Sequence, residues 1–261
     1  MITIINRAVR TGLCAALCLQ LAGCITPGGQ WGSGVQMPSA QSLGSAARQA
    51  AVDPQTWVPL LTAGLLVAAD VDEQWSEDLA DEQALFGGDA EDTSDTLRDI
   101  ATGAYVVTAL LAPSDSVSDK VRGLALGAGT MLVDGVVNQG LKDLTQRDRP
   151  DGSNDESFPS GHASKAASRS ALAMTNLSQI DMPDWLRTTS VWGLHGVAVG
   201  TGLARVEARK HHLSDVLAGY AMGNFVAGFM QRAFAAQEVP LAVRFSQVKD
   251  GGALTFSLPL R

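Results

Sequence analysis

Apolar residues gather in long runs along most of the chain. Three of these runs are VPLLTAGLLVAA (residues 58–69), GAYVVTALLA (residues 103–112) and VLAGYAMGNFVAGFM (residues 216–230). None reaches the roughly 18 uninterrupted apolar residues that a membrane-crossing helix requires. The pattern therefore predicts core helices of a soluble domain.

Six helices are predicted from these runs and from the polar residues that flank them. Asp53 is a candidate N-cap, and Pro54 suits the first helical turn behind it. The next two helices have the candidate caps Thr93, Ser94 or Asp95, and Ser116 or Ser118. The predicted helices cover residues 55–70, 93–112, 117–146, 161–180, 184–207 and 212–236.

The end of the chain has a different period. In LAVRFSQVKDGGALTFSLPL, apolar residues alternate with polar ones on both sides of Asp250-Gly251-Gly252, as in a β-hairpin. The sequence thus predicts an all-α fold. A single-domain helical bundle covers residues 53–237, and a small C-terminal β-hairpin covers residues 238–261.

Residues 1–23 have the plan of a secretory signal peptide, with Arg7 and Arg10 before an apolar run. The segment LAGC resembles the lipobox of bacterial lipoproteins, which implies that Cys24 becomes the lipidated N-terminus. Ile25 after this cysteine resembles the outer-membrane sorting pattern. The expected location is the bacterial cell envelope, lipid-anchored in the outer membrane and facing the periplasm. The alternative is an ordinary signal peptide with an incidental cysteine.

Residues 24–52 are rich in Gly, Ser, Gln and Pro and predict a flexible tether. The chain carries a formal net charge of −8, and loss of the leader with Arg7 and Arg10 makes it about −10. An acidic protein is a poor partner for nucleic acid, so that function class is excluded. The most acidic stretch, Asp70–Asp99, lacks the spacing of a calcium loop and favours a solvated face over a calcium site.

Three clusters in the second half hold the residues suited to phosphate chemistry. KDLTQRDRP places Lys142 and Arg149 seven residues apart, so a continuing helix would present both cations on one side. PSGH places the Ser160 hydroxyl and the amides of the next two residues at a helix N-terminus, where an anion is well held. In ARVEARKHHLSD, His211 precedes Asp215 by four residues, which on a helix brings imidazole and carboxylate together.

Taken together, these clusters resemble the three motifs of the type 2 phosphatidic acid phosphatase superfamily. This superfamily includes the bacterial class A acid phosphatases and the vanadium haloperoxidases. Its first motif is Lys, six residues, Arg-Pro, and its second is Pro-Ser-Gly-His. Its third, Ser-Arg, five residues, His, three residues, Asp, is matched except that Ala204 replaces the serine. The resemblance covers residues 142–215 and implies the helical bundle of this superfamily.

The resemblance also implies a role for each motif residue. His211 would be the nucleophile and form a phosphohistidine, Asp215 would hydrogen-bond its other ring nitrogen, and His162 would protonate the leaving group. Five residues would hold the phosphoryl oxygens: Lys142, Arg149, Ser160, Gly161 and Arg205. These cations replace a metal, so no metal or cofactor is expected, and vanadate would inhibit.

The predicted function is a phosphatase of phosphomonoesters, with lipid phosphates such as phosphatidic acid or prenyl pyrophosphates among the candidate substrates. The partners would be that phosphorylated lipid or small ester, and a membrane reached through the lipid anchor. Two alternatives stay open. One is a vanadium-dependent haloperoxidase, in which the residue matching His211 ligates vanadate; the other is a noncatalytic envelope lipoprotein that binds phospholipid. His212 is expected to be a neighbour of the nucleophile and His195 a packed core residue.

Overall fold

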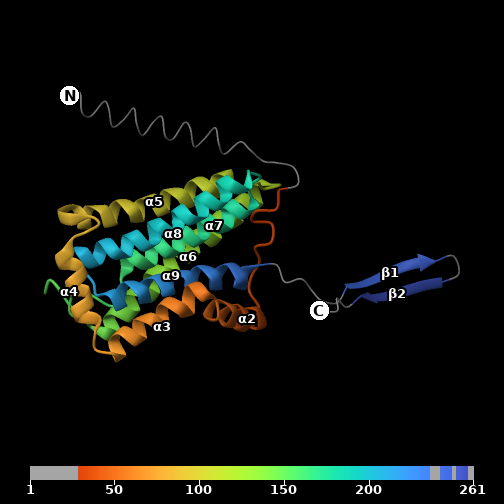
Figure 1. Cartoon of the computed structure of the whole chain (residues 1–261). Helices are drawn as coiled ribbons and strands as arrows, with labels where there is room; N and C mark the ends of the chain where they lie inside the picture. Colours follow the sequence, from red (N-terminus) through yellow and green to blue (C-terminus); the bar gives the residue numbers. More distant parts are fainter. Residues whose placement is uncertain (1–28, 236–241, 249–250, 258–261) are drawn as a thin grey trace, which may run out of the picture.

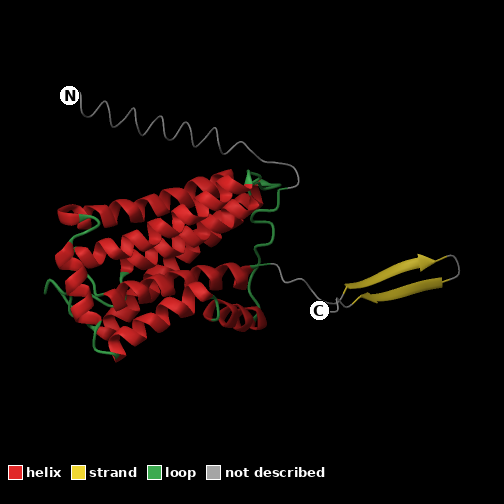
Figure 2. Ribbon diagram, viewed as in Figure 1, coloured by secondary structure: helices red, strands yellow, loops and turns green. Residues whose placement is uncertain are grey.

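A computed structural model describes residues 29–235, 242–248 and 251–257 (Figure 1). The predicted leader, Cys24 and the start of the tether lie outside the described residues and stay predictions. In the part that is described, the main body is helical, which confirms the predicted all-α class (Figure 2). Its helices are α2 (Ala40–Ala51), α3 (Pro54–Ala68), α4 (Asp72–Glu82), α5 (Ala90–Leu111), α6 (Val117–Thr145), α7 (Gly161–Gln179), α8 (Asp184–Glu207) and α9 (Leu213–Phe234), with a 3₁₀ turn, η1 (Gly87–Asp89), before α5.

All six predicted helices are present as α3 and α5–α9. Two of the predicted caps are confirmed, because the side chains of Asp53 and Ser116 accept hydrogen bonds from backbone N–H groups at the starts of α3 and α6. The caps predicted for α5 are wrong. That helix begins earlier, after Asp89, so Ser94 and Asp95 lie inside it and do not cap it. Their side chains contact residues of the candidate site instead.

The predicted flexible tether is wrong for residues 40–51, which form α2. Ser39 caps this helix and exchanges side-chain hydrogen bonds with Ser42, forming a capping box. Ala46 and Ala50 are buried, and α2 packs against α9. A polar, small-residue composition resembles a linker, but its alanines can pack closely once a neighbouring helix is present.

The acidic stretch is only partly the solvated face that was predicted. It contains α4, a helix that the sequence pattern did not indicate, whose positions Asp72, Ser76 and Ala80 are buried one turn apart. Glu73, Glu77 and the other acidic residues of this helix are exposed, as predicted. A carboxylate is therefore buried at one position of a helix that is acidic throughout.

Helix α7 lies at the centre of the bundle and packs against α5, α6, α8 and α9 (Figure 1). Most of its buried residues are small: Ala163, Ser164, Ala166, Ala167, Ser168, Ser170 and Ala173. On α9, a Cβ atom at Gly219 would come within 2.4 Å of the Ser160 carbonyl oxygen, and one at Gly223 within 2.3 Å of the Ser164 carbonyl oxygen. The backbones of α7 and α9 therefore touch where these glycines lie.

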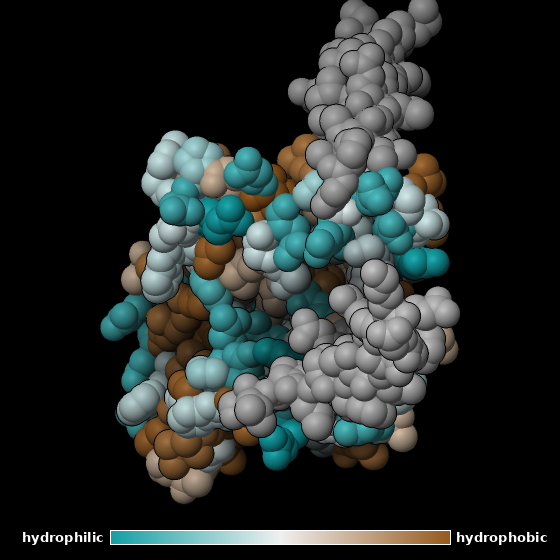
Figure 3. Space-filling model, turned by 90° about the vertical axis from the view of Figure 1, so that its right-hand side faces the viewer, coloured by the Kyte–Doolittle hydropathy of each residue, from teal (hydrophilic) through white to brown (hydrophobic). Residues whose placement is uncertain are grey.

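The apolar run of α3 was predicted to be core, but much of it faces outward. Only Thr56, Ala63 and Leu66 are buried, whereas Leu61 and Leu65 are more than half exposed. Helix α3 packs on α9 along one side, and no other helix covers its outer side among the residues that are described. Figure 3 shows the end of the bundle from which the chain termini leave, where hydrophobic residues reach the surface between hydrophilic ones. Among the described helices, none has both the length and the hydropathy needed to cross a membrane.

The predicted C-terminal β-hairpin is present. Strands β1 (Ala242–Val248) and β2 (Gly251–Ser257) pair antiparallel, from Ala242 opposite Ser257 to Val248 opposite Gly251. The pairing leaves residues 249–250 as the connection, at the start of the predicted Asp-Gly-Gly turn.

The contact between α7 and α9 gives a test of the packing. We expect Gly219→Ala to lower the melting temperature by several degrees, because the added methyl group forces the two helices apart at a cost of about 1–3 kcal/mol. The matched control is Gly196→Ala on α8, where a Cβ atom meets nothing within 4 Å. There the higher helix propensity of alanine should leave stability unchanged or raise it slightly. Equal melting temperatures for the two variants would contradict the close contact.

Candidate active site

The three motif segments meet at one end of the bundle, where α7 and α9 begin. Ser160 precedes α7, and its backbone N–H donates to the Asp215 carbonyl oxygen in the first turn of α9 at 3.0 Å. The same end receives the last turns of α6, with Lys142, and of α8, with Arg205. Two helix N-termini, which attract anions, thus lie beside two buried cations.

The first motif does not follow one helical face as predicted. Helix α6 ends at Thr145, and Gln146 adopts a left-handed conformation with φ of 46°. Arg149 therefore belongs to the loop, where its backbone N–H donates to the Asn154 carbonyl oxygen. The loop, and not helical periodicity, brings Arg149 towards Lys142.

The second motif is confirmed as a helix N-terminus. Ser160 is fully buried and caps α7, accepting a hydrogen bond from the Ala163 N–H. Gly161 is the first helical residue, and a Cβ atom there would come within 3.0 Å of the Asn138 side-chain oxygen. Glycine is the residue that avoids this contact, so the amides at this end of the helix can approach a ligand closely.

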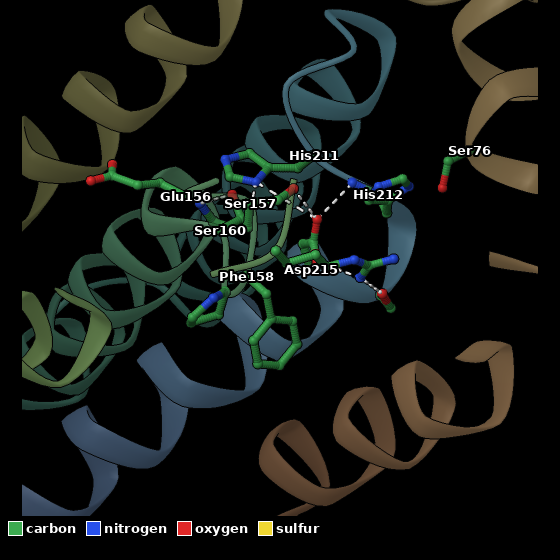
Figure 4. Close-up of polar contacts among 12 residues, drawn as sticks. Ser76, Glu156, Ser157, Phe158, Ser160, His211, His212 and Asp215 are labelled. Atoms are coloured by element: carbon green, nitrogen blue, oxygen red, sulfur yellow. Dashed lines mark hydrogen bonds and ion pairs between the residues drawn. The ribbon is translucent and has the colours of Figure 1, made fainter. Parts of the chain in front are cut away.

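His211 is buried at the centre of the site, with its ring beside Ser157 (Figure 4). Its Nδ1 lies 2.7 Å from the Ser157 carbonyl oxygen. A carbonyl oxygen only accepts, so Nδ1 carries the hydrogen and the neutral ring keeps a lone pair on Nε2. Burial, followed by the positive charges of Arg205, Arg149 and Lys142, holds the pKa of His211 well below 6.5, so the ring is neutral at pH 7.

Asp215 does not hydrogen-bond His211 directly, contrary to prediction. His211 precedes α9 instead of lying on it, and its Nδ1 is 3.9 Å from Asp215 Oδ2, beyond hydrogen-bond range. Oδ2 accepts instead from the Ser157 hydroxyl at 2.6 Å and from the His212 N–H at 2.8 Å (Figure 4). Asp215 thus fixes Ser157 and, through the carbonyl of that residue, the orientation of the His211 ring.

The predicted phosphate-binding cations lie close enough to one another to affect one another's pKa values. Burial lowers the pKa of Lys142, and the charges of Arg149 and Arg205 lower it further, while Glu156 opposes them. The Nε atoms of Arg149 and Arg205 are buried and, within the described residues, have no hydrogen-bond partner. Buried donors of this kind cost free energy, so they favour an anionic acceptor.

His162 is held by two charged residues of α5. Its Nε2 lies 2.8 Å from Asp95 Oδ1, and the Arg98 guanidinium lies 2.8 Å from both of these atoms. A neutral ring either donates from Nε2 to Asp95 or accepts there from Arg98, whereas the imidazolium can only donate to Asp95. In each case α5 engages Nε2, and Nδ1 is the ring atom left for a ligand. Burial and the charge of Arg205 lower the pKa of His162 to about 4, against the opposing effect of Asp95.

The remaining sequence candidates lie outside this centre. His212 lines a small cavity beside α4 that His211 also lines, and its backbone N–H donates to Asp215. His195 is half-buried on α8 and contacts Tyr220 at 3.3 Å, so its predicted packing role is partly met. The acidic stretch contains no cluster of three metal-ligating side chains, and neither does the rest of the described chain.

Residues 123–238 match the family model of the PAP2 superfamily. This segment of the chain is similar to a PAP2 domain. The match spans all three motif segments and confirms the resemblance found in the sequence.

Two relatives show where the likeness lies. The lipid A 1-phosphatase of Porphyromonas gingivalis is 38% identical over 98 residues, which cover 38% of this chain. The aligned part spans about a fifth of that relative's length (20%). The crystal structure of a transmembrane PAP2 type phosphatidylglycerolphosphate phosphatase from Bacillus subtilis is 21% identical, with a TM-score of 0.43. That match covers 68% of this chain and 92% of the other.

The candidate site is stabilised by residues that sequence reasoning missed. Buried Asp72 on α4 accepts from the Ser214 backbone N–H and pairs with Arg147, and Arg147 also pairs with Asp215 at 2.7 Å. Arg147 lies two residues before Arg149, within the first motif, and Asp72 begins the acidic helix. In the sequence, Asp72 differs from the other acidic residues only in its spacing of four and eight residues from Ser76 and Ala80. This spacing alone does not distinguish a buried carboxylate from a solvated one.

The Asp72 network predicts an effect on stability. Burial raises the pKa of Asp72, but the hydrogen bonds from Ser214 and the Arg147 pair lower it below its ordinary value of 3.8. A carboxyl with a lowered pKa stabilises the fold above its unfolded pKa and loses that contribution as the pH falls through its folded pKa. We therefore expect Asp72→Asn to lower the melting temperature at pH 7 by an amount equivalent to about 1–3 kcal/mol.

The deficit of Asp72→Asn should shrink as the pH falls below 3.8, where the wild-type carboxyl also gains a proton. Asp78→Asn, an exposed position on the same helix, serves as the control and should leave the melting temperature within about 0.5 kcal/mol of wild type. A deficit that stays constant down to the acid transition would show that the Asp72 charge is not the source of the effect.

The environment of His162 predicts its titration. We expect the ring to titrate near pH 4 in the free protein, and nearer to 6.5 with inorganic phosphate bound, because the anion offsets the charge of Arg205. Asp95→Asn should lower the value further. NMR titration of the ring protons measures this, and His195, which lies away from the pocket, serves as the internal reference. A His162 signal that does not respond to phosphate would contradict the placement of His162 in the anion pocket.

Proposed function

We propose that the PAP2 domain hydrolyses phosphomonoesters, with phosphorylated lipids as its substrates, through a phosphohistidine on His211. The observation that carries this proposal is a buried, neutral imidazole surrounded by cations, with its Nδ1 hydrogen fixed on the Ser157 carbonyl. A neutral imidazole with a free Nε2 lone pair is a nucleophile, and the cations nearby are the partners that a phosphoryl group needs.

In the first step, the Nε2 lone pair of His211 attacks phosphorus and the bond to the leaving alcohol oxygen breaks. The bound phosphoryl dianion raises the pKa of His162 from about 4, and the ring enters this step as the imidazolium. It gives a proton to that oxygen from Nδ1, while its Nε2–H donates to Asp95. The buried guanidinium of Arg205 and the ammonium of Lys142 neutralise charge on the phosphoryl oxygens. The products of this step are a free alcohol and phosphohistidine.

In the second step, water attacks the phosphohistidine and the phosphorus–nitrogen bond breaks. His162, now neutral, accepts the proton from that water, and inorganic phosphate leaves with His211 restored. The carboxylate of Asp215, 3.9 Å from Nδ1, favours the cationic ring of the intermediate by charge alone. The proton taken from water restores His162 to the imidazolium form in which it began the first step.

A lipid as the leaving group is supported by the relative that is named as a lipid A 1-phosphatase. The exposed apolar side chains of α3, Leu61 and Leu65 among them, agree with work at a lipid surface. The anchor predicted at Cys24 would hold the domain at such a surface.

The proposal predicts a specific loss of hydrolysis. We expect His211→Ala and His162→Ala to lower phosphate release from phosphatidic acid in detergent micelles by at least about 100-fold. The first substitution removes the nucleophile, and the second removes the group that gives and accepts protons. His195→Ala is the matched control and should keep most of the activity. Brief reaction with ³²P-labelled substrate should leave an acid-labile, base-stable label on the wild-type protein, and none on His211→Ala.

Circular dichroism would establish that each variant is folded. Wild-type-like hydrolysis by His211→Ala would overturn the proposed mechanism. Oxidation of bromide by the wild-type protein with added vanadate, in the absence of phosphate release from any ester, would favour the haloperoxidase alternative.

A further inference from the structure

Two cations of the site, Lys142 and Arg205, are each paired with a carboxylate that lies nearer to solvent. Lys142 Nζ is 3.7 Å from Glu156 Oε2, and the Arg205 guanidinium is 3.9 Å from Glu91 Oε1. The cationic side chains are 10% and 4% exposed, whereas Glu156 and Glu91 are 46% and 55% exposed. The positive charges therefore lie at the bottom of the pocket and the negative charges at its rim.

Two further carboxylates complete this arrangement. Lys210 lies 3.4 Å from Glu91 and 3.1 Å from Asp151, and Asp95 holds His162. Burial raises the pKa of Asp151, but hydrogen bonds from Ser153 and the charge of Lys210 lower it to about 2, so this carboxylate stays ionised at neutral pH. We call these four rim residues, from α5 and the α6–α7 loop, the carboxylate collar: Glu91, Asp95, Asp151 and Glu156.

We propose that the carboxylate collar restricts the pocket to a single phosphoryl group, so that the enzyme selects lipid monophosphates over lipid diphosphates. This inference rests on the proposed function and names its substrate class. A phosphoryl dianion at the bottom of the pocket replaces the collar as the partner of Lys142 and Arg205. A second phosphate on the same substrate would then lie at the rim, beside carboxylates of like charge.

The physical basis is the charge of the leaving group in two substrates that have the same acyl chains. The leaving group of a monophosphate is an uncharged alcohol, which passes the collar without electrostatic cost. The leaving group of a diphosphate is itself a phosphate, and its charge meets Glu91 and Glu156 within a few ångströms in a partly desolvated site. In water a phosphate leaves more readily than an alcohol, so a preference for the monophosphate would have to come from the protein.

The test compares phosphatidic acid with diacylglycerol diphosphate of the same acyl chains in detergent micelles. We expect wild-type kcat/KM for the monophosphate to exceed that for the diphosphate by about tenfold or more. In Glu91→Gln/Glu156→Gln, this ratio should fall by at least roughly fivefold, because amides keep the shape of the rim without its charge. High salt should lower the wild-type ratio in the same direction, since ions screen charges at an exposed rim.

The matched control is Asp181→Asn, which neutralises an exposed carboxylate beyond the opposite end of α7 and should leave the ratio unchanged. The single variants Glu91→Gln and Glu156→Gln serve if the double variant does not fold, and each should give part of the effect. A wild-type enzyme that hydrolyses both lipids equally, or a ratio that the collar variants do not alter, would overturn the collar. A wild-type enzyme that hydrolyses neither lipid, nor any other ester, would instead overturn the proposed function.

Discussion

The site depends on the direct contact between the backbones of α7 and α9. Gly219 and Gly223 let α9 approach the Ser160 and Ser164 carbonyl groups, and the small residues of α7 allow the other helices to close around it. This contact sets the two helix N-termini side by side, so that the Ser160 N–H meets the Asp215 carbonyl. His162 lies in the first turn of α7, and His211 lies just before α9. The packing of the two helices therefore sets the position of one histidine relative to the other.

The second requirement is to keep several like charges buried together. Lys142 and Arg205 are buried beside Arg149 around a ring that the same charges keep neutral. Burying several cations close together costs free energy, and carboxylates on two sides of the site offset this cost. Asp72 and Asp215 compensate Arg147 below the site, while the carboxylate collar compensates the cations above it. The same negative charges that stabilise the free site then affect which anion can enter it.

Net charge gives little information about such a site. The chain has a formal charge of −8, yet Lys142, Arg149 and Arg205 lie close together at the proposed anion site. Local geometry resolves this, because a few buried cations and two helix N-termini act over short distances, whereas exposed acidic residues are screened by solvent. The acidic helix α4 shows both effects, since it exposes Glu73 and Glu77 and buries Asp72 as an anchor for the Arg147 network.

The sequence by itself determined the helices α3 and α5–α9, the hairpin and the identity of the motif residues. Apolar runs, caps such as Asp53 and Ser116, and the spacing of PSGH are local features, and local features follow from the chain without its partners. Only the tertiary structure decided that α2 forms within a linker-like stretch, that Arg149 approaches Lys142 from a loop, and that Asp215 acts on His211 through Ser157. It also placed Asp72, Asp95 and Glu91 at the site. The sequence does not distinguish a carboxylate that faces water from one that pairs with a cation. Its role depends on which helix packs against it.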